Sequence, residues 1–287
     1  MTQKQKGILL ITASSFFFAL MNLFVRLSGD LPAIQKSFFR NFVALIFAAI
    51  LLFQERPKLT FTPKSKRHLF LRALFGTVGI LCNFYAVDHL VLADASMLNK
   101  MSPFCAVIFG AFLLKEKPNR FQSISILVAF IGVLFIVKPT GNWDLIPAFI
   151  GLMGGICAGA AYTYVRSLGQ QNIAGPFIVF FFSAFSCVVT LPYLLLQFHP
   201  MTGTQILYLL LAGLGAAGGQ FTITAAYCYA PAREISVYDY FQIPFSALLG
   251  FLIFGQIPDW LSLVGYIIIC GTAVAMFLHT TKKQKPA

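Results

Sequence analysis

The sequence predicts an all-α polytopic membrane protein with ten transmembrane helices. Two of the observations are compositional: 58% of its 287 residues are hydrophobic and only 10% are charged, whereas soluble domains carry ~25% charged residues. The third is positional, because apolar runs of about 20 residues, long enough to cross a bilayer, follow one another along the chain. Together these observations exclude an ordinary soluble enzyme.

The apolar runs are separated by short breaks rich in Pro, Gly and charged residues, and the helix ends are placed at these breaks. The first run contains bulky residues and no small-residue cleavage site, so it predicts a retained helix and not a secretory signal. The least distinct break lies at 229–234, where Pro231 and Arg233 interrupt an apolar stretch. The ten expected helices span 7–28, 33–54, 69–88, 93–114, 121–138, 146–168, 174–197, 204–229, 234–254 and 260–280.

The basic residues predict the orientation, because cytoplasmic loops are enriched in Lys and Arg. With the N-terminus in the cytoplasm, 16 of the 21 Lys and Arg residues fall on the cytoplasmic side, Arg72 among them, and only Arg26, Lys36 and Lys138 fall on the other side. We therefore expect a multi-pass protein of the cytoplasmic (inner) cell membrane with both termini in the cytoplasm. The net charge of +12 then reflects topology, and no nucleic-acid partner is expected.

The chain is interpreted as two five-helix repeats, residues 1–140 and 141–287. Because five is an odd number of crossings, the second repeat enters the membrane in the inverted orientation. Inverted repeats are typical of secondary transporters, whose sites lie near the midplane between the repeats. An ungapped alignment of the two repeats, called the repeat alignment below, superimposes Arg26 on Arg166, Gly79 on Gly219, Ser96 on Ser236 and Pro118 on Pro258.

Short motifs recur in the same order in both halves. They are FFRN at 38–41, FYA at 84–86, ADA at 93–95, Pro103 and LLKE at 113–116, followed by AAY at 225–227, APA at 230–232, Pro244 and FLIFG at 251–255. Over essentially the whole chain they resemble EamA-type members of the drug/metabolite transporter superfamily. The resemblance implies a metabolite or drug carrier with a central cavity, lined mainly by the helices at 69–88, 93–114, 204–229 and 234–254. Gln256 or Gly255 stands where the first half has Glu116, so the resemblance implies no paired role for that acid.

Three charged residues are expected deep in the membrane, where a charge at a helix centre costs ~2.5–3.5 kcal/mol. Arg40 and Lys100 lie about seven residues in from the outer side, hence ~10 Å deep, and Asp239 lies at a comparable depth from the cytoplasmic side. These opposite depths allow a Lys100–Asp239 ion pair only if the helices are tilted or broken. Such residues are candidates for a functional site, although Arg40 can also reach outward to the interface.

Polar residues at helical spacing form a stripe on two equivalent helices. Ser96, Asn99 and Lys100 share one helix face, and the repeat alignment maps them onto Ser236, Asp239 and Tyr240. The candidate substrate-binding residues are Arg40, Asn83, Ser96, Asn99, Lys100, Gln220, Thr224, Tyr227, Tyr238, Asp239 and Tyr240. Structural roles remain open for some of them, because Asn side chains often bridge membrane helices and Tyr238 can be an ordinary packed aromatic.

These features predict a secondary active transporter that moves a small organic metabolite by alternating access. Two deep cations favour an anionic, zwitterionic or amino-acid-like substrate, whose amine would meet Asp239. Asp94, the acid nearest Lys100 in sequence, is expected either to neutralise one cation in part or to be solvated. Asp239 is the candidate for proton coupling, because burial favours the neutral form of a carboxylic acid; exchange of substrates is the other source of energy.

Three alternatives remain: an efflux carrier for drugs or cationic compounds, a membrane-embedded transferase for lipid-linked substrates, and a passive channel or structural membrane subunit. The sequence contains neither the acidic DxxD cluster typical of such transferases nor a Walker A motif. The six cysteines lie in apolar runs without metal-ligand spacing, so no disulfide framework or metal site is expected. We expect no enzymatic activity and no cofactor, and a monomer or weak homodimer surrounded by membrane lipids.

Overall fold

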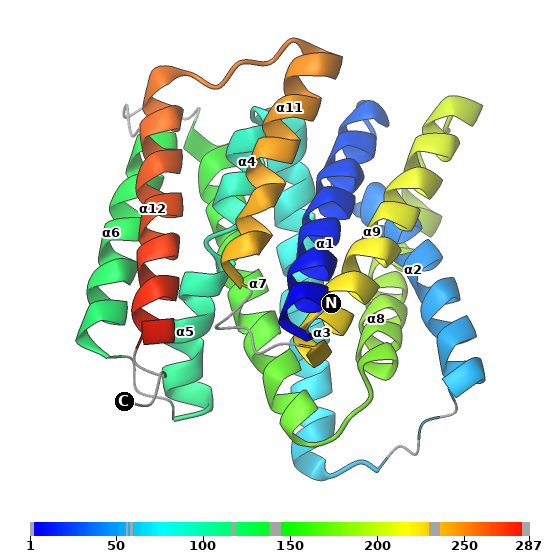
Figure 1. The fold of residues 1–287 in the computed structure, drawn as a ribbon. Coiled ribbons are helices and arrows are strands. Elements are labelled where there is room, and N and C mark those ends of the chain that lie inside the picture. The colour runs from blue at the N-terminus through cyan, green and yellow to red at the C-terminus, as the bar shows by residue number, and fades with distance from the viewer. Residues whose placement is uncertain are drawn as a thin grey trace.

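The computed structural model describes residues 3–55, 57, 60–115, 119–137, 145–229 and 236–282, and every regular element in these ranges is a helix (Figure 1). The elements are α1 (Gln3–Leu27), α2 (Ala33–Glu55), α3 (Pro63–His89), α4 (Leu92–Asn99), α5 (Ser102–Leu113), α6 (Arg120–Val137), α7 (Ile146–Gln170), α8 (Gly175–Leu196), α9 (Gly203–Tyr229), the 3-10 helix η2 (Ser236–Phe241), α11 (Gln242–Phe254) and α12 (Trp260–Lys282).

These elements make ten membrane crossings. Nine segments of the described chain are long and apolar enough to cross a bilayer, and α12 contains a shorter apolar stretch, Trp260–Met276. Two of the crossings consist of two pieces each: α4 with α5 form one, and η2 with α11 form the other. The chain is a ten-helix polytopic membrane protein, which confirms the fold class expected from composition and apolar runs.

The outer surface of the helix bundle is apolar and the interior is partly polar. Phe53, Phe112 and Leu196 are 79%, 80% and 84% exposed, as is favourable only where lipid tails surround the protein. In contrast, Lys36 and Arg40 are among the largest fully buried side chains. The charged side chains that need a functional explanation therefore face the inside of the bundle.

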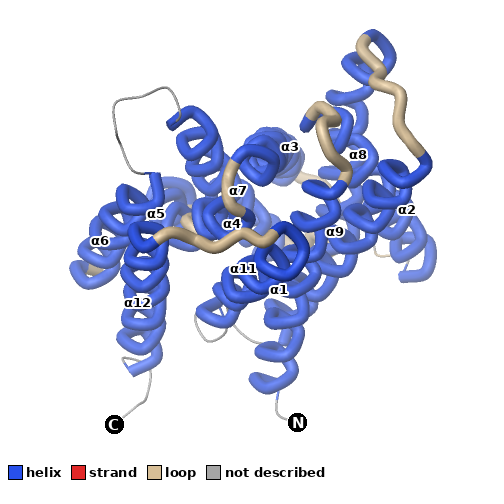
Figure 2. The backbone as a smooth tube through the Cα atoms, turned by 90° about the horizontal axis from the view of Figure 1, so that it is seen from above, coloured by secondary structure: helices blue, strands red, loops and turns tan. Residues whose placement is uncertain are grey.

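Helices of the first half pack against helices of the second. The main pairs are α1 with α9, α3 with α7, α2 with α8 and α6 with α12, and α4 also contacts α11. Seen from above, α6 and α12 lie at one end of the molecule and α2 and α8 at the other, with α1, α3, α4, α7 and α11 between them (Figure 2). The centre of the molecule is thus built from both halves.

The closest helix contacts depend on glycine. A Cβ atom at Gly79 of α3 would lie 3.3 Å from the carbonyl oxygen of Gly154 in α7, so small residues permit the close approach of these backbones. At the α1–α9 contact, a Cβ atom at Gly219 would lie 2.7 Å from the ring of Phe18. Gly79 and Gly219 are superimposed by the repeat alignment, so both large contacts use equivalent positions.

Two crossings are interrupted where the sequence predicts continuous helices. The first is broken at Lys100 and Met101, between α4 and α5. Pro103 follows in the first turn of α5. Backbone N–H groups in the first turn have no intrahelical acceptor, so a proline there costs no hydrogen bond. The second crossing changes from η2 to α11 after Phe241. The repeat alignment maps Met101 onto Phe241, so the two interruptions lie at equivalent positions.

Candidate functional site

Lys100 and Asp239 meet at these two interruptions. Lys100 Nζ lies 2.6 Å from Asp239 Oδ2, and the two side chains are 5% and 8% exposed. Ser15 of α1 supports the acid, since its hydroxyl donates to Asp239 Oδ1 over 3.3 Å. The ion pair that the sequence allows only between tilted or broken helices is therefore formed. Depth counted along two unbroken helices placed the residues apart, whereas the breaks bring them together.

The acid nearest in sequence has a different position from the one expected. Asp94 is buried, and the hydroxyl of Tyr266 in α12 donates to its Oδ1 over 2.6 Å. The expectation that Asp94 is a solvated residue at the start of its helix is therefore wrong. The carboxylate that neutralises Lys100 comes from the second half of the chain, from Asp239, and not from Asp94.

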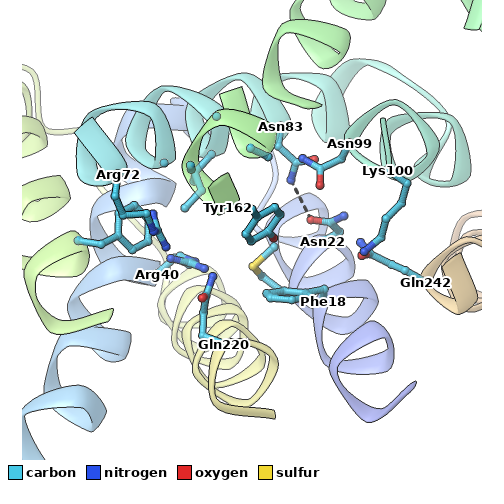
Figure 3. A pocket seen from close by; sticks show the side chains of 17 residues that line it. Phe18, Asn22, Arg40, Arg72, Asn83, Asn99, Lys100, Tyr162, Gln220 and Gln242 are labelled. Atoms are coloured by element: carbon cyan, nitrogen blue, oxygen red, sulfur yellow. Dashed lines mark hydrogen bonds between the residues drawn. The ribbon is translucent and has the colours of Figure 1, made fainter. Parts of the chain in front are cut away.

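A small cavity of about 70 Å³ lies between the two halves beside this ion pair. Figure 3 shows Arg40 and Arg72 towards one end, Lys100 and Gln242 towards the other, and Tyr162 between them. Ligand pockets for small molecules usually measure about 300–1,000 Å³, so a metabolite fits only if the surrounding helices move. The lining residues are Phe18, Met21, Asn22, Arg40, Arg72, Gly76, Gly79, Ile80, Asn83, Asn99, Lys100, Ala158, Ala161, Tyr162, Phe182, Gln220 and Gln242.

The structure brings five of the predicted site residues together on this cavity. They are Arg40, Asn83, Asn99, Lys100 and Gln220. Asp239 does not line the cavity itself and is joined to it through Lys100. The side chains of Thr224 and Tyr227, also predicted for this site, lie outside the described part of the structure.

Ser96 belongs to a chain of polar contacts between helices and does not line the cavity. Asn83 Nδ2 donates to Asn22 Oδ1 over 3.1 Å, and Asn22 Nδ2 donates to Ser96 Oγ over 3.4 Å. Ser96 Oγ lies 2.8 Å from Ser246 Oγ of α11. This chain joins α3, α1, α4 and α11, so Asn83 and Ser96 bridge helices in the way that polar side chains commonly do in membranes.

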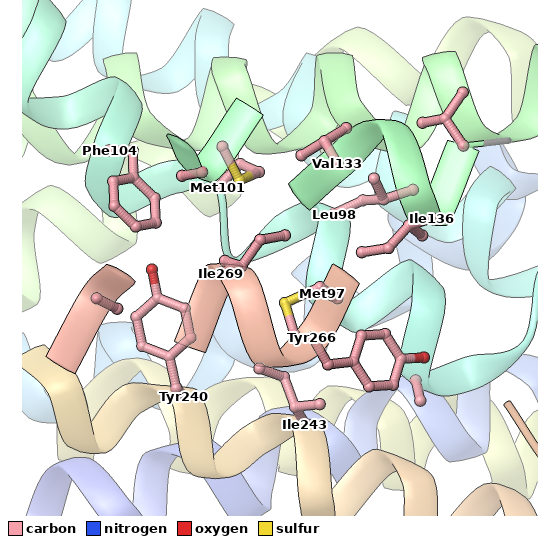
Figure 4. Close-up of a cluster of buried hydrophobic side chains, with 14 of the residues drawn as sticks. Met97, Leu98, Met101, Phe104, Val133, Ile136, Tyr240, Ile243, Tyr266 and Ile269 are labelled. Atoms are coloured by element: carbon pink, nitrogen blue, oxygen red, sulfur yellow. The ribbon is translucent and has the colours of Figure 1, made fainter. Parts of the chain in front are cut away.

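The two tyrosines of η2 do not line the cavity either. The hydroxyl of Tyr240 donates to the backbone carbonyl of Lys100 over 3.1 Å, and its ring packs near Phe104 in an apolar cluster (Figure 4). The ring of Tyr238 stacks on Phe241, with 6.3 Å between the ring centroids. Tyr240 therefore holds the first interruption from the second half of the chain.

Sequence reasoning missed several cavity residues, above all Arg72. The orientation count assigned Arg72 to the cytoplasmic side, but it lies within α3, is 4% exposed and lines the cavity. One signal was present: Gly76, Gly79 and Asn83 share a helix face, and the same face reaches Arg72 one turn earlier. The remaining missed residues, which no sequence pattern distinguished, include Asn22, Tyr162, Phe182 and Gln242.

The chain is similar to known membrane transporters. The EamA-like transporter family matches residues 5–138. The pseudopaline exporter CntI of Pseudomonas aeruginosa (strain UCBPP-PA14) is 33% identical over 282 residues, which cover 97% of this chain and 98% of the exporter. Solute carrier family 35 member G1 of Homo sapiens is 25% identical over 297 residues, covering 96% of this chain and 81% of the human protein.

A solved crystal structure shows the same fold. It aligns with a TM-score of 0.68 at 18% identity and covers 96% of this chain and 98% of that chain. The relatives and the family description concern transporters, in agreement with a cavity enclosed by both halves of a membrane protein. The chain therefore belongs to the EamA-like transporter family of the drug/metabolite transporter superfamily and transports a small molecule across a membrane.

Proposed function

We propose that this protein is a secondary carrier that moves a small anionic or zwitterionic organic metabolite across the cytoplasmic membrane by alternating access. One observation carries the proposal: the buried Lys100–Asp239 ion pair joins the two interrupted crossings, one from each half, beside a polar cavity. Broken helices near the midplane are the usual place for a transporter site. Because breaking a buried ion pair is costly, this contact distinguishes conformations in which the breaks meet from those in which they separate.

The arrangement of the halves supports an inverted repeat of residues 1–140 and 141–287. In the repeat alignment α1 corresponds to α7 and α9 to α3, so the α1–α9 pair corresponds to the α7–α3 pair. The α2–α8 and α6–α12 pairs correspond to themselves. Alternating access follows if one conformation exchanges the roles of the two halves.

The charges of the cavity support an acidic substrate. Lys100 and Asp239 cancel one another, and Arg40 and Arg72 remain. A cationic compound would enter against two guanidinium groups, whereas a carboxylate would receive hydrogen bonds from them. This sign of charge disfavours the alternative of a carrier for cationic drugs. A zwitterion is accommodated if its amine competes with Lys100 for Asp239.

Asp239 is the proposed coupling residue. A proton on Asp239 removes one charge of the ion pair and so weakens the contact between the interrupted helices. Protonation and substrate binding would then act on the same contact, as coupling requires, because a ligand shifts a conformational equilibrium only through a difference in affinity. Exchange of one substrate for another uses the same site without the proton.

Transport by purified protein in lipid vesicles tests the proposal. Vesicles loaded with mixed amino acids and organic acids are assayed for counterflow of each labelled compound. We expect counterflow of anionic or zwitterionic metabolites and none of cationic drugs. Counterflow limited to cationic drugs would overturn the substrate class, and flux without counterflow would indicate a channel.

Replacement of Asp239 by Asn tests the coupling role. The Asp239→Asn variant keeps the size of the side chain and removes its charge, so we expect counterflow to persist while pH-driven accumulation is lost. Asp259→Asn is the matched control, because Asp259 caps α12 through the N–H of Ser262 at the surface and Asn caps helices equally well. Unchanged accumulation by Asp239→Asn across a pH series would refute coupling at this residue.

A further inference from the structure

Arg40 and Arg72 form a cationic pair on one wall of the cavity (Figure 3). Arg40 is 1% exposed and Arg72 is 4% exposed. The ring centroid of Phe182 lies 5.8 Å from Cζ of Arg40 and 4.1 Å from Cζ of Arg72, so one ring holds both guanidinium groups by cation–π contact. Gly76 leaves room for them, since a Cβ atom there would collide with Nη1 of Arg72 and lie 2.8 Å from the ring.

Within the described residues, both guanidinium groups lack a counter-charge. Arg40 Nη1 donates to Asn41 Oδ1 over 2.6 Å, but Nε of Arg40 and Nε of Arg72 have no hydrogen-bond partner. Among the side chains that the structure describes, no carboxylate lies within ion-pair distance of either arginine. Each group therefore keeps donors that only a ligand or water can satisfy.

The two lysines that are buried in the described part of the chain, Lys36 and Lys100, are each paired with a carboxylate. Lys36 Nζ lies 2.7 Å from a carboxylate oxygen of Asp88, and Lys100 Nζ lies 2.6 Å from Asp239. The interior thus neutralises both lysines and neither of the paired arginines. Both guanidinium groups lie over the same Phe182 ring and line the same cavity, so retaining two like charges in a medium of low dielectric constant is unfavourable unless an anion binds beside them.

We propose that Arg40 and Arg72 form a subsite for the doubly negative end of the substrate, either two carboxylates or one phosphate group. The inference rests on the proposed function and narrows the proposed substrate class from anions or zwitterions to molecules with a doubly negative end. Two negative charges cancel both arginines, whereas a single carboxylate leaves one buried cation uncompensated. Arginine also suits this role because its planar fork donates two parallel hydrogen bonds to such oxygens.

The test compares dianions with monoanions as ligands of the purified full-length protein. Melting temperature is measured in detergent at constant ionic strength. The dianions are malonate, succinate and inorganic phosphate, at a pH where each is doubly charged, and the monoanions are acetate and propionate. We expect the dianions to stabilise the protein with at least about tenfold lower apparent Kd, as one added charge-assisted interaction predicts. A preference for malonate and succinate over phosphate identifies two carboxylates, and the reverse identifies a phosphate.

Matched variants locate the effect. Arg40→Gln and Arg72→Gln each remove one guanidinium charge, so either should reduce the dianion preference to about the level of the monoanions. Arg120→Gln removes the same charge from an exposed position at the start of α6 and should keep the preference. Arg72→Lys keeps the charge without the planar fork and should restore part of the preference.

The outcomes separate this inference from the proposed function. Equal stabilisation of the wild-type protein by monoanions and dianions would overturn the dianion subsite, whatever the variants do. A dianion preference that survives both Gln substitutions would also overturn it. Counterflow of monocarboxylates only would overturn the subsite and leave the carrier standing, whereas dianion binding without any counterflow would contradict the carrier and leave the subsite standing.

Discussion

At the scale of single residues, the missing side chain of Gly76 shapes the cavity as much as the charged side chain of Arg72 does. Gly76 has no side chain, and the guanidinium of Arg72 occupies the space a methyl group would need. Among the polar residues of the cavity, Asn83 bridges two helices, whereas Nε of Arg72 is buried without a hydrogen-bond partner. Gly76 therefore permits the position that the guanidinium group of Arg72 occupies.

Gly76→Ala should displace Arg72 from Phe182 and weaken dianion binding by about tenfold or more, because a misplaced guanidinium loses a charge-assisted bond. The measurement is the ligand-induced shift in melting temperature. Gly271→Ala in α12 is the control, since a Cβ atom there meets nothing within 4 Å. Equal ligand response in the two variants would contradict the role of Gly76.

At the scale of elements, the first interrupted crossing, α4 with α5, is held by close packing of α7. A Cβ atom at Gly155 would collide with the carbonyl oxygen of Leu98 and lie 3.4 Å from that of Asn99. A Cβ atom at Gly159 would lie 2.8 Å from the carbonyl oxygen of Ser102. These glycines place α7 against the backbone on both sides of the break at Lys100, so they act as packing positions.

Gly155→Ala should destabilise the protein by about 1–3 kcal/mol, because backbone atoms of α4 cannot move aside as a flexible side chain can. Gly169→Ala on the same helix meets nothing within 4 Å and should leave the melting temperature unchanged or slightly raised, as expected for Ala over Gly in a helix. Thermal unfolding in detergent measures both. Equal melting temperatures of the two variants would show that α7 does not set the position of the break.

At the scale of the whole molecule, hydrogen bonds join the two halves at the end of the bundle that is predicted to face outward. Gln256 Oε1 accepts from the N–H of Leu92 over 3.1 Å, and Gln35 Nε2 donates to the carbonyl of His199 over 2.9 Å. Figure 1 shows the α11–α12 loop at the top and the start of α3 at the bottom. If both termini are cytoplasmic, the top of this view is the outer face.

Cysteine labelling tests this orientation. In a background without the six native cysteines, Ile257→Cys should react with an impermeant thiol reagent from outside intact cells, because Ile257 is 72% exposed in the α11–α12 loop. Lys66→Cys, at an exposed position near the start of α3, should react only after the cells are opened, since basic loops stay in the cytoplasm. The reverse pattern would invert the topology.

The sequence by itself determined the membrane class, the ten crossings and the family, and it predicted Arg40 and Lys100 as candidate site residues, both of which line the cavity. These conclusions depend on local properties, because apolar length and the cost of a buried charge are read from neighbouring residues. Only the tertiary structure decided that Lys100 pairs with Asp239, that Tyr240 holds the first interruption, and that Arg72 joins Arg40. Each of these is a contact between segments distant in the chain, and such contacts depend on where helices break and cross. Helical periodicity assumes a continuous helix, so it lost accuracy at the two breaks, where the candidate site is built.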